Sequence, residues 1–374
     1  MFFQCDLNHQ IVFGNGTLDQ LPELIHGMGR NVFLTTGRSA KQRGLLSHLM
    51  ELLTDFQVLH FDQISPNPKA EEVHQAVNLL KQEGFEPDFV LAVGGGSVLD
   101  FAKAVAASFA SGTSVENVFG INNVPAALPL VAVPTTHGTG SEVTKYAIIT
   151  HENQKKSISD AKIVPELALV DPVLTYSMPE DVAIDTTLDA FSHLSEAYFS
   201  ALCNPLVEAF AEKGFSYLAP HMKNLGRIPM AEKVHDELTL ASLFGGLAIN
   251  NAGSGVVHAM GYPLTSEFEL PHGRANAVLM PWVFKFNAEV KPEKYQKMSE
   301  MLGVSDLADY LCSINEQCGF VEQIKGVASQ VDESKLLNWA EQVVNNHRLM
   351  NSACRKPSLE QVVELYKEAL FMTA

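Results

Sequence analysis

Short apolar runs alternate with amphipathic segments through the first half of the chain. Four of these runs are predicted strands, at residues 31–36, 56–61, 89–93 and 128–133. They are almost continuously apolar, which is typical of strands that are covered on both faces of a sheet. Between them, Lys69–Gln82 carries apolar residues at helical spacing. This alternation of strand and helix predicts an open parallel sheet of the Rossmann-like, α/β kind.

The pattern changes after Met178. From Pro179 onward the chain is dominated by helical periodicity, with helices expected at residues 185–201, 204–222, 237–250 and 358–370. A chain of 374 residues also exceeds what one ordinary hydrophobic core accommodates. We therefore predict an α/β dinucleotide-binding domain over residues 1–178 and an all-helical domain over residues 179–374.

The charge balance and the cysteines narrow the possible partners and the location. A formal net charge of −17 disfavours nucleic acids and anionic membranes as partners. The apolar stretch at residues 238–264 is interrupted by Asn250, Asn251 and His258, so buried helices are expected there and not a membrane span. Five cysteines without a Cys-x-x-Cys pair, and a first segment unlike a signal peptide, predict a reducing, cytoplasmic location.

Two loops after predicted strands carry candidate cofactor chemistry. The strand at 89–93 runs into Gly94, Gly95, Gly96 and Ser97, and a helix is expected from Val98. Glycines let the backbone approach a phosphate, and a helix start offers free N–H groups, so this turn predicts a pyrophosphate cradle. An ordinary glycine-rich turn is the alternative, because Leu99 stands where the G-x-G-x-x-G fingerprint has its third glycine.

The second loop follows the strand at 128–133 and extends from Pro134 to Thr144. It places four hydroxyl residues and two glycines before Glu142. Hydroxyl groups and exposed N–H groups suit ribose and phosphate oxygens, although a simple polar turn has the same composition.

One carboxylate and three imidazoles form a candidate metal site in the second half. Asp189 and His193 are four residues apart in a helical segment and therefore lie on one helix face. His258 and His272 follow farther along the chain. This donor set suits Fe²⁺ or Zn²⁺ and not Ca²⁺ or Mg²⁺. Core histidines without a metal, or Asp185 in place of Asp189, remain alternatives, because sequence spacing does not show that the two segments meet.

Taken together, these segments resemble the iron-containing alcohol dehydrogenase family. The matching pieces are GGGSVLDFAKA, PTTHGTGSEVT, the DAFSH segment, and VVHAMGYPL followed by LPHGRANAVLMP, in the family's order. The resemblance covers nearly the whole chain. It implies the dehydroquinate synthase-like architecture, with an α/β domain before an all-helical domain that binds metal and substrate.

The resemblance also assigns residues to roles. It implies Asp189, His193, His258 and His272 as metal ligands. It implies a cofactor site that includes Asn67, Gly94, Gly95, Gly96, Ser97, Asp100, Thr135, Thr136, Ser141, Thr144 and Lys155. For the last position the adjacent Lys156 leaves the register open by one residue. Where many members carry a second histidine that relays a proton, this chain has Tyr262, which is either a replacement relay or a packing residue.

The turn after the first predicted strand bears on the choice of cofactor. An acidic side chain at this place usually binds the adenosine ribose and repels a 2′-phosphate. Here Gly37 occupies it, and Arg38 and Ser39 could hold the 2′-phosphate through charge and hydrogen bonds. The chain is therefore predicted to prefer NADP over NAD, although Arg38 could also be a solvated surface charge.

The expected reaction is hydride transfer between NAD(P)(H) and a small alcohol or aldehyde, assisted by a bound Fe²⁺ or Zn²⁺. Other specificities on the same fold are alternatives: glycerol dehydrogenase-like, maleylacetate reductase-like, or phosphonoacetaldehyde reductase-like, the last favoured by Tyr262–Thr265 and Asn204-Pro205. A non-catalytic NADP-binding sensor is the alternative from another class. The resemblance also implies a homo-oligomer, commonly a dimer.

Overall fold

The computed structural model describes residues 3–7, 10–227 and 229–371. The chain separates into two compact units. One is an α/β unit formed by Leu7–Thr136 and Gly140–Ser177, and the other is a helical unit formed by the chain from Met178 onward. Residues 3–6 and the short segment His137–Thr139 belong to the helical unit, so the chain enters that unit briefly between two stretches of the α/β unit.

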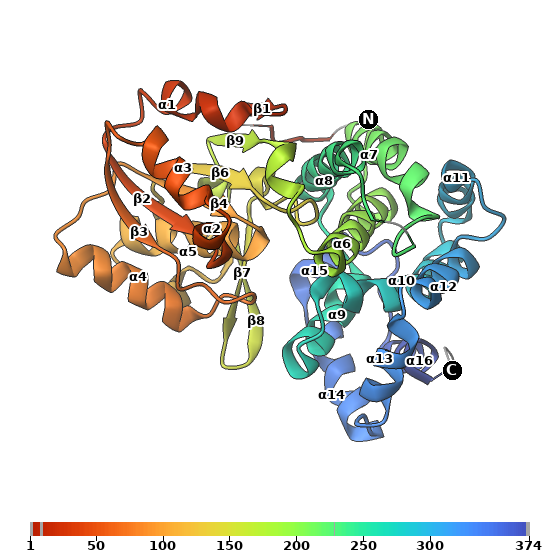
Figure 1. Ribbon diagram of the computed structural model, residues 1–374. Helices are drawn as coiled ribbons and strands as arrows, with labels where there is room; N and C mark the ends of the chain where they lie inside the picture. Colours follow the sequence, from red (N-terminus) through yellow and green to blue (C-terminus); the bar gives the residue numbers. More distant parts are fainter. Residues whose placement is uncertain (1–2, 8–9, 228, 372–374) are drawn as a thin grey trace. The chain divides into compact units, whose positions relative to one another are not determined.

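A six-stranded parallel sheet forms the centre of the α/β unit, in the order β1-β9-β6-β4-β2-β3 (Figure 1). Its strands are β1 (Gln10–Phe13), β2 (Asn31–Thr36), β3 (Gln57–Phe61), β4 (Phe89–Gly94), β6 (Leu130–Pro134) and β9 (Leu167–Val170). A second sheet, β5-β8-β7, contains β5 (Gly120–Ile121), β7 (Tyr146–His151) and β8 (Gln154–Ser159). The predicted parallel sheet and its four predicted strands are confirmed.

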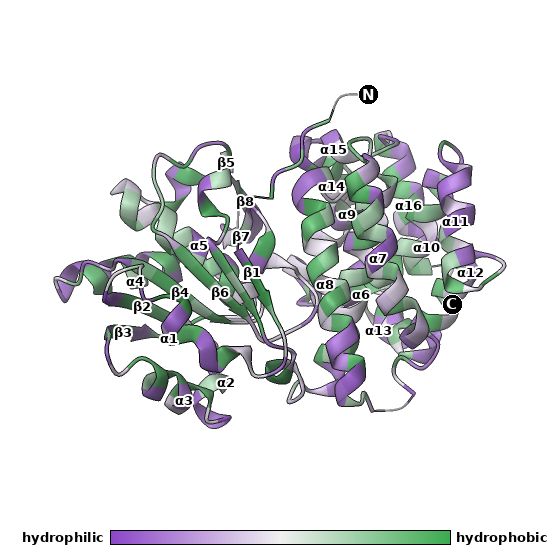
Figure 2. Cartoon of the chain, turned by 90° about the horizontal axis from the view of Figure 1, so that it is seen from above, coloured by the Kyte–Doolittle hydropathy of each residue, from purple (hydrophilic) through white to green (hydrophobic). Residues whose placement is uncertain are grey.

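Helices cover both faces of the large sheet, which explains the continuous apolar runs. They are α1 (Leu21–Leu24), α2 (Ser39–Gln42), α3 (Leu45–Leu52), α4 (Ala70–Gln82) and α5 (Gly96–Ser111). On β4, Val90 and Ala92 belong to the core shared with α4 and α5, whereas Leu91 and Val93 belong to the core shared with α1 and α3. Successive side chains of a strand face opposite sides, so each side must be apolar here. Figure 2 shows the central strands in the hydrophobic colour.

The helical unit contains eleven helices within its described residues. They are α6 (Glu180–Phe199), α7 (Pro205–Met222), α8 (Glu232–Ala252), α9 (Val256–Phe268), α10 (His272–Ala288), α11 (Pro292–Leu302), α12 (Leu307–Gln317), α13 (Phe320–Ala328), α14 (Glu333–Val344), α15 (His347–Ser352) and α16 (Leu359–Phe371). α6 packs on α7, α8 and α10, and fifteen of its residues are buried. A helix buried on nearly all sides can carry polar residues only if they are paired or bind a ligand.

Across the part of the chain that the structure describes, no single helix combines the length and hydropathy needed to cross a bilayer. α8 and α9 reach these values only as a pair, and the pair is bent by 110°.

Candidate functional site

The predicted cradle lies in the glycine turn after β4. β4 ends at Gly94, and Gly95 precedes α5 with an extended backbone. A Cβ atom on Gly94 would lie 2.6 Å from Val98, so only glycine fits there. Gly95, Gly96 and Ser97 are partly exposed, so the start of α5 offers backbone N–H groups and a positive dipole end to an anion.

The cradle lies where the strand order reverses. β3 is added on one side of β2 and β4 on the other side. The order in which the chain adds strands to the sheet therefore reverses between β2 and β4. Thr36 pairs with Val93, which makes Gly37 and Gly94 the next residues of neighbouring strands. A Cβ atom on Gly37 would lie 3.8 Å from Val98, at the start of the same helix. Open parallel sheets bind nucleotides at the carboxyl ends of the strands at such a switch point.

A buried lysine organises the second predicted loop. Lys103 of α5 is fully buried, and its Nζ donates to the carbonyl oxygens of Ser141, Thr144 and Tyr146 at 2.6, 2.7 and 2.9 Å. The hydroxyl oxygens of Ser141 and Thr144 lie 2.9 and 3.2 Å from the same Nζ and share its three N–H donors. Burial lowers the pKa of Lys103 to about 8. Sequence reasoning missed this residue, although a lysine between Phe101-Ala102 and Ala104-Val105 is a recognisable signal.

In the same cluster, three of the predicted cofactor positions, Asp100, Ser141 and Thr144, form hydrogen bonds with protein groups. Ser141 Oγ donates to Asp100 Oδ1 at 2.7 Å, and the backbone N–H of Ile148 donates to Asp100 Oδ2 at 2.9 Å. The side chains of Ser141 and Thr144 are buried. Thr135 and Thr136 are partly exposed, and Thr136 lies beside Gly95, where a Cβ atom would lie 3.2 Å from its side chain. The two threonines thus border the cradle.

The two adjacent lysines of β8 have different partners. Lys155 Nζ donates to Asn67 Oδ1 at 2.5 Å, and burial lowers the pKa of Lys155 to about 8. Lys156 Nζ donates to its neighbour Gln154 at 2.8 Å. Ser97 Oγ donates to the carbonyl of Pro66, so the loop that carries Asn67 touches the cradle. The predicted residues Asn67, Ser97 and Lys155 therefore lie in one neighbourhood.

The predicted metal ligands of the helical unit converge. Asp189 and His193 lie on α6, His258 on α9 and His272 at the start of α10. Asp189 Oδ1 lies 4.0, 3.9 and 3.8 Å from the Nε2 atoms of His193, His258 and His272, respectively. Asp189, His193 and His258 are buried, whereas the His272 side chain is 32% exposed. One side of the cluster is therefore accessible.

The donor atoms fit a cation. His193 Nδ1 donates to the carbonyl oxygen of Gly138 at 3.1 Å, and His258 Nδ1 donates to Glu196 Oε2 at 2.6 Å. In a neutral imidazole the other nitrogen then carries a lone pair. The two Nε2 atoms lie only 2.9 Å apart beside a carboxylate, an arrangement that a divalent transition metal satisfies.

Glu196 is a site residue that the sequence did not reveal. It lies on α6, is 5% exposed, and accepts from the backbone N–H groups of Gly255 and Val257 at 2.8 and 2.7 Å in addition to His258. It thus caps the start of α9 and fixes the His258 tautomer, as the outer carboxylates of metal-bound histidines do. Glu196 follows His193 by three residues and therefore lies on the same helix face, and this spacing could have identified it from the sequence.

The alternative ligand Asp185 is paired with another side chain. Both of its oxygens accept from Arg274, at 3.0 and 2.9 Å, in a bidentate ion pair. Asn276 instead reaches the cluster, and its Nδ2 donates to Asp189 Oδ1 at 3.1 Å. The same Nδ2 lies 3.3 Å from His272 Nε2, so a positively polarised group already lies among the candidate ligands.

Tyr262 lies beside the cluster, one helical turn after His258. Its ring centroid is 6.0 Å from that of His272, and its hydroxyl oxygen accepts from Arg348 Nη2 at 2.9 Å. Sequence reasoning did not identify Arg348, which comes from the distant helix α15. Arg348 orients the phenol of Tyr262 at the edge of the site.

A parallel sheet with a glycine turn at its switch point, followed by a helical unit that carries a candidate transition-metal site, defines the architecture of the chain. Residues 8–172 match the family model for iron-containing alcohol dehydrogenase, and residues 183–370 match that for the C-terminal part of the Fe-containing alcohol dehydrogenase family. The chain belongs to the iron-containing alcohol dehydrogenase family. It is therefore an oxidoreductase that acts on CH–OH groups.

Individual relatives agree with this assignment. Alcohol dehydrogenase 4 from Schizosaccharomyces pombe is 34% identical over 283 residues, which cover 74% of this chain and 67% of the relative. The crystal structure of an iron-containing alcohol dehydrogenase from Thermotoga maritima is 30% identical, has a TM-score of 0.88 and covers 99% of both chains.

Relatives differ in their nicotinamide cofactor. An NADPH-dependent butanol dehydrogenase from Clostridium saccharobutylicum is 27% identical over 364 residues, which cover 93% of this chain and 92% of the relative. An NAD-dependent methanol dehydrogenase from Bacillus methanolicus is 31% identical over 78% of each chain. The family thus supports iron and NAD(P) in general, and the choice between NAD and NADP depends on this chain's own residues.

Proposed function

We propose that this protein is a metal-dependent dehydrogenase that transfers a hydride between a nicotinamide cofactor, preferably NADP, and a small alcohol or aldehyde. The observation that carries the proposal is the convergence of Asp189, His258 and His272, whose donor atoms lie within 4.8 Å of one another. His193 adjoins this group, with its Nε2 atom 2.9 Å from His258 Nε2 and 4.0 Å from Asp189 Oδ1. We assign these four residues as the ligands of Fe²⁺ or Zn²⁺. When bound, the metal supplies Lewis acidity toward a substrate oxygen, and the nicotinamide supplies or accepts the hydride.

The chain's own residues prepare the site for this chemistry. The Gly138 carbonyl and Glu196 hold protons on the Nδ1 atoms of His193 and His258, which keeps both Nε2 atoms available. Burial opposes the charge of Asp189, but His193, His272 and His258 outweigh it, so the pKa of Asp189 is lowered and its carboxylate stays ionised. We assign proton delivery to Tyr262, whose phenol Arg348 orients.

The cofactor assignment combines the two loops and the turn after β2. We assign Gly94, Gly95, Gly96 and Ser97 to the pyrophosphate, and Asn67, Thr135, Thr136 and Lys155 to the neighbouring phosphate and ribose oxygens. Asp100, Ser141 and Thr144 act through the Lys103 cluster, because their side chains contact protein groups. Gly37, Arg38 and Ser39 support NADP, since none of them carries the carboxylate that repels a 2′-phosphate.

The test is aldehyde-dependent oxidation of NADPH by anaerobically purified protein loaded with Fe²⁺ or Zn²⁺, compared with a chelator-treated control. We expect turnover only in the loaded protein, and a higher kcat/KM with NADPH than with NADH. Full activity after complete metal removal would contradict the role of the four ligands. Metal and NADPH binding without turnover of any aldehyde would instead favour a sensor. We keep the cytoplasm and a homodimer as predictions, tested by cell fractionation and by light scattering.

A further inference from the structure

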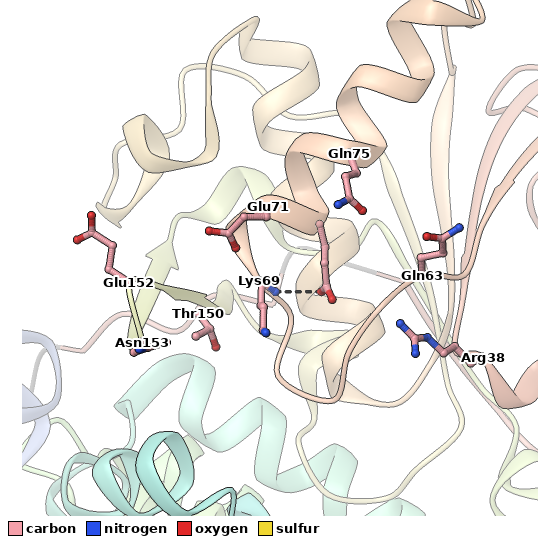
Figure 3. A pocket seen from close by; sticks show the side chains of 9 residues that line it. Arg38, Gln63, Lys69, Glu71, Gln75, Thr150, Glu152 and Asn153 are labelled. Atoms are coloured by element: carbon pink, nitrogen blue, oxygen red, sulfur yellow. Dashed lines mark hydrogen bonds between the residues drawn. The ribbon is translucent and has the colours of Figure 1, made fainter.

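A polar pocket of about 540 Å³ opens beside the carboxyl ends of β2 and β3. Arg38 comes two residues after β2, and Gln63 comes two residues after β3. Lys69 directly precedes α4, the helix that follows β3. In Figure 3, Arg38 and Gln63 lie on one side of this pocket, and Lys69 and Thr150 lie on the other.

The position of the pocket matches the adenosine end of a dinucleotide. In doubly wound sheets, the strand next to the phosphate-binding strand carries the residue that recognises the adenosine ribose. Here β2 is that neighbour of β4. One short loop also links the two places, because Pro66 accepts from Ser97 of the cradle and Lys69 lines the pocket three residues later. A cofactor held by the cradle would thus have its ribose within reach of Lys69.

Both positive and negative side chains line the pocket, and they differ in whether the protein already pairs them. The Glu72 carboxylate is held by the backbone N–H groups of Lys69 and Ser65 at 3.0 and 3.3 Å. Arg38 and Lys69 are exposed cations at the wall. Two cations and neutral donors such as Thr150 suit a phosphate, which takes strong charge-assisted hydrogen bonds. Glu71 and Glu152, exposed carboxylates that also line the pocket, oppose an anion.

We propose that Lys69 acts with Arg38 as a specificity determinant that binds the 2′-phosphate of NADP. This inference rests on the proposed use of NADP. The two cations approach the phosphate from loops that follow adjacent strands, so each contributes to the discrimination between NADP and NAD. Glu71 limits that discrimination by like-charge repulsion.

The experiment is calorimetric titration with the cofactor fragments 2′,5′-ADP and 5′-ADP, which differ by the 2′-phosphate and require no turnover. The wild-type protein is expected to bind 2′,5′-ADP more tightly. Lys69→Met should weaken 2′,5′-ADP binding about tenfold, as expected for loss of one charged phosphate contact, and leave 5′-ADP unchanged. Lys81→Met, at the other end of α4, is the matched control and should change neither affinity. Lys69→Arg should retain the preference, and Glu71→Gln should strengthen it.

The outcomes separate the two proposals. A wild-type protein that binds both fragments equally would overturn the proposed NADP preference and, with it, this role of Lys69. A wild-type preference that survives intact in Lys69→Met would overturn the role of Lys69 alone. If Lys69→Met lowers the affinity for 2′,5′-ADP and for 5′-ADP equally, Lys69 maintains the structure of the loop and does not determine specificity. In the full enzyme, the ratio of kcat/KM for NADPH and NADH should fall in parallel with the fragment preference.

Discussion

Single hydrogen bonds decide what the candidate metal site can bind. His258 presents its Nε2 atom because Glu196 accepts the proton of Nδ1, and His193 does so because of the Gly138 carbonyl. A carboxylate can only accept here, so the tautomer of His258 is fixed. The availability of each ligand therefore depends on a residue that need not touch the metal.

Glu196→Gln tests this dependence. The Val257 N–H donates to Oε1 and would hold the amide oxygen there, which leaves the NH₂ group in the place of Oε2, opposite His258 Nδ1 and the Gly255 N–H. The imidazole proton then moves to Nε2. We expect the affinity for Zn²⁺ or Fe²⁺ to fall roughly 10- to 100-fold, as measured by competition with a chromophoric chelator. Glu237→Gln, which alters the distant pair with His221, is the matched control. Equal affinities of wild type and Glu196→Gln would remove Glu196 from the site.

His137 provides a pH-dependent prediction. It is fully buried beside His235, and within the described part of the chain neither of its ring nitrogens has a hydrogen-bond partner. Burial, with a contribution from His235, lowers the pKa of His137 from 6.5 to about 3. Because the folded pKa is lowered, the neutral form contributes stability above pH 6.5, and this contribution is lost as the pH falls toward 3.

His137→Leu should remove that loss. The measurement is the free energy of unfolding of both metal-free proteins, by urea denaturation at pH 7.5 and at pH 5. As the pH falls from 7.5 to 5, the variant should become more stable than the wild type by about 2 kcal/mol. At pH 7.5 the two proteins should differ little, because the substitution removes polar atoms that have no partner. Parallel pH profiles would show that His137 is hydrogen-bonded or charged in solution.

At the scale of elements, the contact between α6 and α10 sets the distance between ligands. Gly273, next to His272, lies so close to α6 that a Cβ atom would be 1.7 Å from the Asp185 carbonyl oxygen. The ion pair of Asp185 with Arg274 fixes the same crossing. Asp189 and His272 meet because the two backbones touch here.

Gly273→Ala should force the two helices apart. We expect the free energy of unfolding to fall by roughly 3 kcal/mol or more, with a parallel loss of metal affinity, measured by denaturation and chelator competition. Gly326→Ala in α13 is the control, because a Cβ atom there meets nothing within 4 Å. It should instead stabilise its helix by roughly 0.5–1 kcal/mol. A Gly273→Ala protein as stable as wild type would contradict the close helix contact.

Local signals predicted some elements well and missed others. The helix expected at residues 358–370 is α16, and the Gln361 side chain accepts from the Ser358 N–H at its start at 2.9 Å. The pattern overlooked β7 and β8, because β8 (QKKSIS) has no apolar alternation. Their pairing is stabilised by the backbone ladder and by a turn in which Glu152 and Asn153 have positive φ angles.

At the scale of the whole molecule, a metal that binds only the folded chain should stabilise it. At a metal concentration one hundredfold above the dissociation constant, the gain is about 2.7 kcal/mol. We expect chelation to lower the melting temperature and Zn²⁺ or Fe²⁺ to restore it, as followed by calorimetry. His272→Ala should show a smaller metal-dependent shift. A melting temperature independent of metal in the wild type would contradict a folded-state site.

The sequence by itself determined the parts that depend on local periodicity. The runs at β2, β3, β4 and β6 predicted a parallel sheet, because strands covered on both faces must be apolar throughout. The spacing of Asp189 and His193 placed both on one helix face, since residues four apart always share a face. His258 and His272 were candidates from residue type alone, and only the resemblance linked them to Asp189 and His193 as one ligand set.

Only the tertiary structure decided which of these faces meet. It brought α9 and α10 to α6, paired Asp185 with Arg274, and placed Glu196, Asn276 and Arg348 around the candidate ligands. It also buried Lys103 among the oxygens of Ser141, Thr144 and Tyr146. Helical and strand periodicity identify the side that an element buries. The partner of that side depends on close packing between segments far apart in the chain, which no local pattern contains.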